Sequence, residues 1–154
     1  MKLLSLVRNL TFTLVALCLT WALAMPMPTA IAADAAKTPA PADAAVYIIT
    51  PQDGDTVSSP ISVKFGLSGM GVAPAGVEAP KTGHHHLLID LEELPDFDQP
   101  LAATAQIKHF GGGQTETNLE LPAGTHTLQL LLGDYTHIPH TPPVVSAPIT
   151  ITVK

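Results

Sequence analysis

Residues 61–67 read Ile-Ser-Val-Lys-Phe-Gly-Leu, and this stretch decides the fold class. Its apolar residues stand at every second position, which is the period of a β-strand with one buried face. The same alternation recurs in residues 147–153, which read Ala-Pro-Ile-Thr-Ile-Thr-Val. No long segment shows the helical period, so the sequence predicts an all-β protein.

Further short apolar runs bring the number of expected strands to about seven. The clear ones are 46–50, 61–67, 85–91, 115–121, 125–132 and 147–153, and a weaker one lies near 101–108. Pro122-Ala123-Gly124 is interpreted as a hairpin connection between two of them. Seven short strands in about 110 residues are typical of an immunoglobulin-like antiparallel β-sandwich, which we expect over residues 46–154.

The N-terminal part of the chain has the composition of a targeting segment. Lys2 and Arg8 precede an apolar run, and Ala30-Ile31-Ala32 matches the small-x-small pattern of signal peptidase sites. We therefore expect residues 1–33 to be a signal peptide and the mature protein to be periplasmic or secreted. An uncleaved signal that acts as an anchor is the alternative. Residues 34–45 are rich in Ala and Pro and predict a disordered linker.

Composition excludes several classes of function. Beyond residue 33 the chain has five lysines, no arginine and 13 acidic residues, a formal charge of −8. Such a chain lacks the basic patch that nucleic acid requires. Cys18 is the only cysteine and lies in the apolar run, so the mature protein has neither disulfides nor thiolate ligands. After cleavage no apolar segment is left to hold the protein in a membrane.

Histidine is the chemically informative residue type. All seven histidines fall between positions 84 and 140: they are His84, His85, His86, His109, His126, His137 and His140. Imidazole is the commonest metal ligand in proteins and titrates near neutral pH. The clustering therefore indicates metal or proton chemistry. Imidazole without thiolate suits Zn²⁺, Cu²⁺ or Ni²⁺.

Strand parity separates the three consecutive histidines. His85 shares its parity with Leu87 and Ile89, which we assign to the core face. His84 and His86 share the other face, about 7 Å apart at Cα, a spacing at which two imidazoles can converge on one ion. They are the first candidate ligands. The alternative is a polar, solvated strand edge.

The remaining candidate ligands lie on expected loops. His109 precedes three glycines that allow a close approach of the backbone. His137 and His140 flank Ile138-Pro139, and in extended chain they stand about 10 Å apart, too far to share one ion unless Pro139 lies in a turn. Asp134 or Asp90 is expected to supply an oxygen ligand or to orient an imidazole.

Position 126 calls for a separate interpretation. His126 has the parity of the leucines that follow it in the expected strand. We expect it at the inner rim of the sandwich, hydrogen-bonded to a turn, with a structural role.

Three motifs resemble a family of small exported bacterial proteins, domain of unknown function 4399. They are GHHHLLID at 83–90, HFGGGQTE at 109–116 and LLLGDYTHIPH at 130–140. The opening ITPQDGDTV at 49–57 and LPAGTHTLQ at 121–129 also fit. The resemblance covers nearly all of residues 46–154. It implies one exported domain and no established activity.

The leading functional hypothesis is an exported cell-envelope protein that binds a divalent transition metal, Zn²⁺ or Cu²⁺, through His84, His86, His109, His137, His140 and Asp134. The alternative is a structural or interaction module that binds an envelope protein or glycan. A metalloenzyme is the third possibility, because it needs an open coordination position and a general acid or base, for which Glu116 and Asp134 are candidates.

Overall fold

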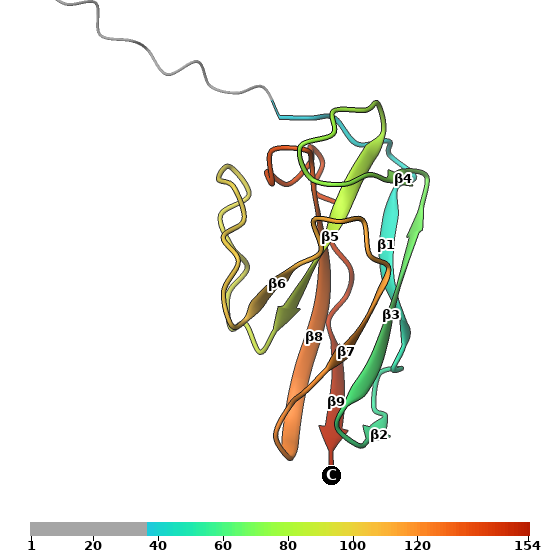
Figure 1. Cartoon of the computed structure of the whole chain (residues 1–154), viewed down its shortest axis with the longest axis vertical. Coiled ribbons are helices and arrows are strands. Elements are labelled where there is room, and N and C mark those ends of the chain that lie inside the picture. Colours follow the sequence, from blue (N-terminus) through green and yellow to red (C-terminus); the bar gives the residue numbers. More distant parts are fainter. Residues whose placement is uncertain (1–36) are drawn as a thin grey trace, which may run out of the picture. The chain divides into compact units, whose positions relative to one another are not determined.

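The computed structural model describes residues 37–154, which form two packed β-sheets (Figure 1). The smaller sheet has the order β1-β3-β7, with β1 at Ala45–Thr50, β3 at Ile61–Ser68 and β7 at Glu116–Leu119. The larger sheet has the order β2-β9-β8-β5-β4, and β6 also pairs with β5. Its strands are β2 (Thr56–Val57), β4 (Gly71–Val72), β5 (Thr82–Ile89), β6 (Ile107–His109), β8 (Gly124–Gly133) and β9 (Ile149–Val153).

The strand arrangement is that of an immunoglobulin-like sandwich, as the sequence predicted. Of the seven strands with three or more residues in the described part of the chain, the first, second and fifth form one sheet. The third, sixth and seventh form the centre of the other, which is the immunoglobulin order. The fourth, β6, pairs with the third, β5. Residues 37–154 include no helix that could cross a membrane.

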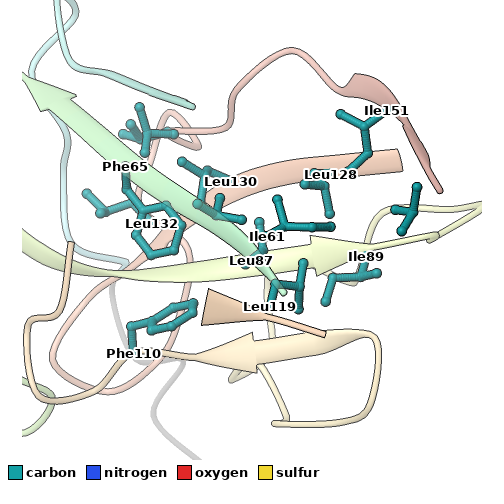
Figure 2. Close-up of a cluster of buried hydrophobic side chains, with 14 residues drawn as sticks. Ile61, Phe65, Leu87, Ile89, Phe110, Leu119, Leu128, Leu130, Leu132 and Ile151 are labelled. Carbon is teal, nitrogen blue, oxygen red and sulfur yellow. The ribbon is translucent and has the colours of Figure 1, made fainter. Parts of the chain in front are cut away.

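The core lies between the sheets and is built by the alternating apolar residues (Figure 2). Val63 on β3, Leu87 on β5 and Leu130 on β8 are all fully buried there. Leu87 and Ile89 belong to this cluster, which confirms the parity assigned to β5. Complete burial of one such leucine contributes about 2 kcal/mol.

The expected hairpin at Pro122–Gly124 is wrong. β7 pairs with β3 in the smaller sheet, whereas β8 pairs with β5 and β9 in the larger one. The connection therefore crosses from one sheet to the other. Proline and glycine mark a change of direction but carry no information on the partner of the next strand.

The segment before β1 also differs from expectation. The signal peptide predicted at 1–33 lies outside the described residues. Within the predicted disordered linker, residues from Lys37 onward pack against the domain. Thr141 N–H donates to Thr38 O and Ala40 N–H donates to Thr141 O, at 3.0 and 2.9 Å. These two bonds and the contacts of Ala40 and Ala44 with the core hold the segment in place.

β5 is buried on both of its faces. One face meets the main core, and on the other Leu88 packs with Leu101, Ile107 and Leu131 in a second apolar cluster. The loop between β5 and β6, yellow in Figure 1, supplies Leu101 to this cluster. This second face also carries His84 and His86, so the fold places them beneath loops and away from solvent.

Candidate metal centre

The floor of the candidate site is made by His84 and His86 on β5. Both side chains are 0 % exposed, so the solvated-edge interpretation is wrong. This face of the strand is covered because the ring of His109 packs against both imidazoles and that of His137 packs against His84. The rings of His84 and His86 lie on one face with centroids 4.9 Å apart, as strand parity predicted.

β6 places the third imidazole. His109 stands opposite His86 in the antiparallel β5–β6 pair, and the two ring centroids are 5.1 Å apart. The ring of His109 needs the glycine that follows two residues later, because a Cβ at Gly111 would lie 2.3 Å from His109 Cε1. His109 is exposed and forms part of the rim of the site.

The loop between Gly133 and Pro139 places the fourth imidazole. His137 adopts a φ of 72°, in the left-handed region, which turns the chain back on itself. His137 N–H donates to Asp134 O, and Asp134 N–H donates to Ile138 O, each at 2.9 Å. The turn brings the half-buried His137 ring to 5.0 Å from His84 and 4.8 Å from His109.

The Asp134 carboxylate holds this loop together. Its Oδ1 accepts bonds from Thr136 N–H, Thr136 Oγ1 and Ile138 N–H at 2.8, 2.7 and 3.0 Å. Its Oδ2 accepts from Thr38 Oγ1 at 2.7 Å. Burial opposes ionisation of Asp134, but these bonds outweigh it and lower the pKa of the carboxyl. Asp134 therefore positions the loop, and its oxygens face hydrogen-bond donors.

Most of the separations among the four rings match those of a tetrahedral imidazole complex. Five of the six centroid separations lie between 4.8 and 5.1 Å, and the sixth, His86 to His137, is 6.3 Å. With metal–nitrogen bonds of about 2.0–2.1 Å, four imidazoles around one ion have ring centres about 5 Å apart. One ligand atom each from His84, His109 and His137 already lies within 4.8 Å of the others.

The protonation state of the buried imidazoles favours the binding of a cation. Burial and, to a smaller extent, neighbouring imidazoles lower the pKa of His84 to about 4 and that of His86 to about 3, although the Asp134 carboxylate opposes this at His84. Burial also lowers the pKa of His109. The two floor imidazoles are therefore neutral at neutral pH, which is the form that binds metal. All four of their ring nitrogens are buried without a protein hydrogen-bond partner.

His140, the other predicted ligand on this loop, lies on the opposite face of β5. Its Nε2 stands 3.1 Å from Thr82 O, and its Cε1 would be 2.9 Å from a Cβ on Gly83. That Cβ position also meets Leu132 of the main core. The structure thus brings together four predicted ligands, His84, His86, His109 and His137, and leaves His140 and the Asp134 carboxylate outside the group.

The two remaining histidines have other surroundings. His85 is fully buried on the core face, and its ring lies 5.3 Å from that of Phe65. His126 Nδ1 is 2.7 Å from Asp90 Oδ2 and its Nε2 is 3.0 Å from Pro122 O. His126 therefore occupies the inner rim beside a turn, where its parity placed it.

Alanine and glycine residues connect the segments that carry the imidazoles and leave room for the rings. This role was not predicted from the sequence. Ala75 N–H donates to Gly111 O and Gly76 N–H donates to Tyr135 O, so one segment ties the His109 strand to the His137 loop. Gly133 leaves room for His86, whose Cε1 would lie 2.8 Å from a Cβ there. The only sign of this role in the sequence is that Gly133 directly follows a run of leucines.

Comparison with known proteins identifies the family. No curated protein and no solved structure matches the chain. The model of one family matches residues 63–154, which include all seven histidines, and this agrees with the resemblance seen in the sequence motifs. Because the match covers more than half of the chain, the protein belongs to the family described as domain of unknown function 4399.

Proposed function

We propose that this protein binds one divalent transition-metal ion through His84, His86, His109 and His137. The observation that carries the proposal is the convergence of four imidazoles from three separate segments at ring spacings near those of a metal complex. Without an ion, the ring nitrogens of His84 and His86 are buried without partners, which costs about 1–3 kcal/mol for each group.

The donor set supports Zn²⁺ or Cu²⁺. Imidazole nitrogen is a borderline ligand that suits both ions, whereas Mg²⁺ and Ca²⁺ prefer oxygen. Met70 is the only methionine among residues 37–154, so thioether ligands that would favour Cu⁺ are absent from the group.

Metal titration tests the proposal. Untagged wild-type protein should bind one equivalent of Zn²⁺ or Cu²⁺ in calorimetry at neutral pH, and His84→Ala/His86→Ala should abolish tight binding. His109→Gln alters an exposed residue, so it should keep the fold and lower the affinity at least about tenfold. His126→Gln is the matched control outside the cluster and should bind as the wild type does.

The outcome of the titration separates the hypotheses. Circular dichroism checks that each variant keeps its β-structure. If the wild type binds metal no more tightly than the double variant, the metal-binding hypothesis is wrong. The alternative, a structural or interaction module of the cell envelope, is then favoured.

We also propose that the protein is exported and acts in the periplasm or outside the cell. Lys2, Arg8, the apolar run after them and Ala30-Ile31-Ala32 support this. N-terminal sequencing of the extracytoplasmic protein should begin at Ala33 or Asp34. A membrane-bound product that retains Met1 would contradict export as a soluble protein.

A further inference from the structure

The four rings depart from a regular tetrahedron along one edge. The separation between His86 and His137 is 6.3 Å, against 4.8–5.1 Å for the other five pairs. A metal–nitrogen bond of about 2.0–2.1 Å places each ring centre about 3.2 Å from the ion. Two rings 6.3 Å apart then lie almost opposite each other. Such widening is how a four-coordinate ion makes room for a fifth ligand.

Gly133 lies against the His86 ring, one of the two rings of the widened edge. A Cβ on Gly133 would lie 2.8 Å from His86 Cε1 and 3.5 Å from the carbonyl carbon of His137. The φ of Gly133 lies outside the left-handed region, so the backbone alone does not require glycine there. Glycine at position 133 therefore leaves room for the His86 ring, at one end of the widened edge.

The proposed donor set carries no negative charge of its own. All four proposed ligands are imidazoles, and no carboxylate joins His84, His109 and His137, the three residues of 37–154 whose ligand atoms lie within 4.8 Å of one another. The nearest acid of the loop, Asp134, has its two oxygens engaged by four hydrogen bonds. Four neutral imidazoles would leave a bound divalent ion with a positive charge that the Asp134 carboxylate, whose charge acts on His84, offsets only in part, so the centre would attract an anion. His109 is exposed and His137 is half-buried, so the rim gives solutes access.

We propose that the ion held by the four histidines binds a small monodentate anion as a fifth ligand across the His86–His137 edge. This inference rests on the metal binding proposed above. It makes the centre a site of ligand exchange, in contrast to a closed structural site in which four protein ligands fill the coordination sphere.

Azide titration of the Cu²⁺-loaded protein tests the inference. Azide should produce a new, saturable charge-transfer absorption and a changed electron paramagnetic resonance spectrum with one azide per copper. Copper content after desalting should stay at one equivalent. Unchanged spectra while copper remains bound would overturn the fifth ligand but leave metal binding intact, whereas a protein without copper would remove both. Release of copper by azide would also overturn the inference.

Two glycine variants localise the anion. Gly133→Ala should weaken azide binding at least tenfold, because the new methyl group displaces the His86 ring at one end of the widened edge. Gly112→Ala is the matched control, since a Cβ there meets only the Gln114 side chain. Equal azide affinities in the two copper-loaded variants would overturn the assigned position. If Gly133→Ala loses copper or fails to fold, the wild-type titration decides whether a fifth ligand binds.

Discussion

At position 85 an imidazole fills a place in the core that would suit an aliphatic side chain. Its ring is fully buried beside Phe65, and both ring nitrogens lack a hydrogen bond of ordinary geometry. Burial lowers its pKa to about 4, although the Gln114 backbone opposes this. The side chain therefore sits as a neutral group in apolar surroundings, apart from the imidazole cluster on the opposite face of β5.

Replacement of His85 separates structure from metal binding. His85→Leu removes two unsatisfied nitrogens while keeping a similar volume, and we expect it to raise the free energy of unfolding by about 1–2 kcal/mol. Urea denaturation measures this change, and calorimetry should show unaltered metal affinity. A loss of metal binding in a well-folded His85→Leu protein would contradict the division between the two faces.

The Asp90–His126 pair should make stability depend on pH. Both ring nitrogens of His126 face acceptors, so the protonated ring satisfies both. The hydrogen bond with Asp90 raises the pKa of His126 above its usual 6.5. The contribution to stability is therefore complete below pH 6.5 and is lost as the pH rises through the folded-state pKa.

Asp90→Asn tests this dependence. Asparagine tolerates the φ of 52° at this position and keeps the acceptor for Thr127 N–H. The Asp90 side chain is 41 % exposed, so we expect a loss of only about 1 kcal/mol near pH 5.5, shrinking at alkaline pH. Urea unfolding of both proteins across this range gives the difference. A difference that grew with pH would show that the sign is wrong.

At the level of single residues, the sequence predicted which face each β5 histidine occupies, because alternation follows from strand geometry alone. It did not distinguish His137 from His140 as the ligand. That choice depends on the left-handed backbone of His137 and on the pairing of Gly133 with Pro139. Neither feature produces a periodic pattern in the amino-acid sequence.

Among the elements, the loop that carries His137 depends most on one side chain. Asp134→Ala would leave its hydrogen-bond donors, Thr136, Ile138 and Thr38, without their acceptor. We expect a loss of about 1–3 kcal/mol of stability and about tenfold weaker metal binding, because His137 loses its fixed position. Glu93→Ala, which alters an exposed acidic residue, is the control and should change neither.

Calorimetry and urea unfolding of these two variants provide the measurement. Metal affinity equal to that of the wild type in Asp134→Ala would show that the loop is organised by its backbone alone.

The strands themselves were largely predictable, whereas their partners were not. β1, β3, β8 and β9 appear within one to two residues of their expected ranges, because each is a short apolar run, with clear alternation in β3 and β9. β6 is shorter than expected and starts at Ile107, since the residues before it form a loop anchored by Leu101. The assignment of β7 and β8 to different sheets follows from packing across the whole sandwich, which a local turn motif does not encode.

For the whole molecule, metal binding should raise the melting temperature. The ligands come from β5, β6 and the loop after β8, and the unfolded chain does not hold them together. An ion at 100 times its dissociation constant adds about 2.7 kcal/mol to the native state. We expect a rise in Tm of about 10 °C in calorimetric scans.

A chelator should reverse this shift, and His84→Ala/His86→Ala should not show it. A similar rise in that variant would indicate binding elsewhere on the protein.

The two-sided burial of β5 has a consequence for folding fidelity. If β5 shifted by one residue against β8, its side chains would exchange faces. His85 would then lie beneath the loops, and His84 and His86 would enter the hydrophobic core beside Phe65. Such a misaligned molecule would lose its packing and its ligands in the same step. Only molecules with the native pairing of β5 and β8 would bind metal. The fraction of protein molecules that bind metal would therefore measure the fraction with the native strand register.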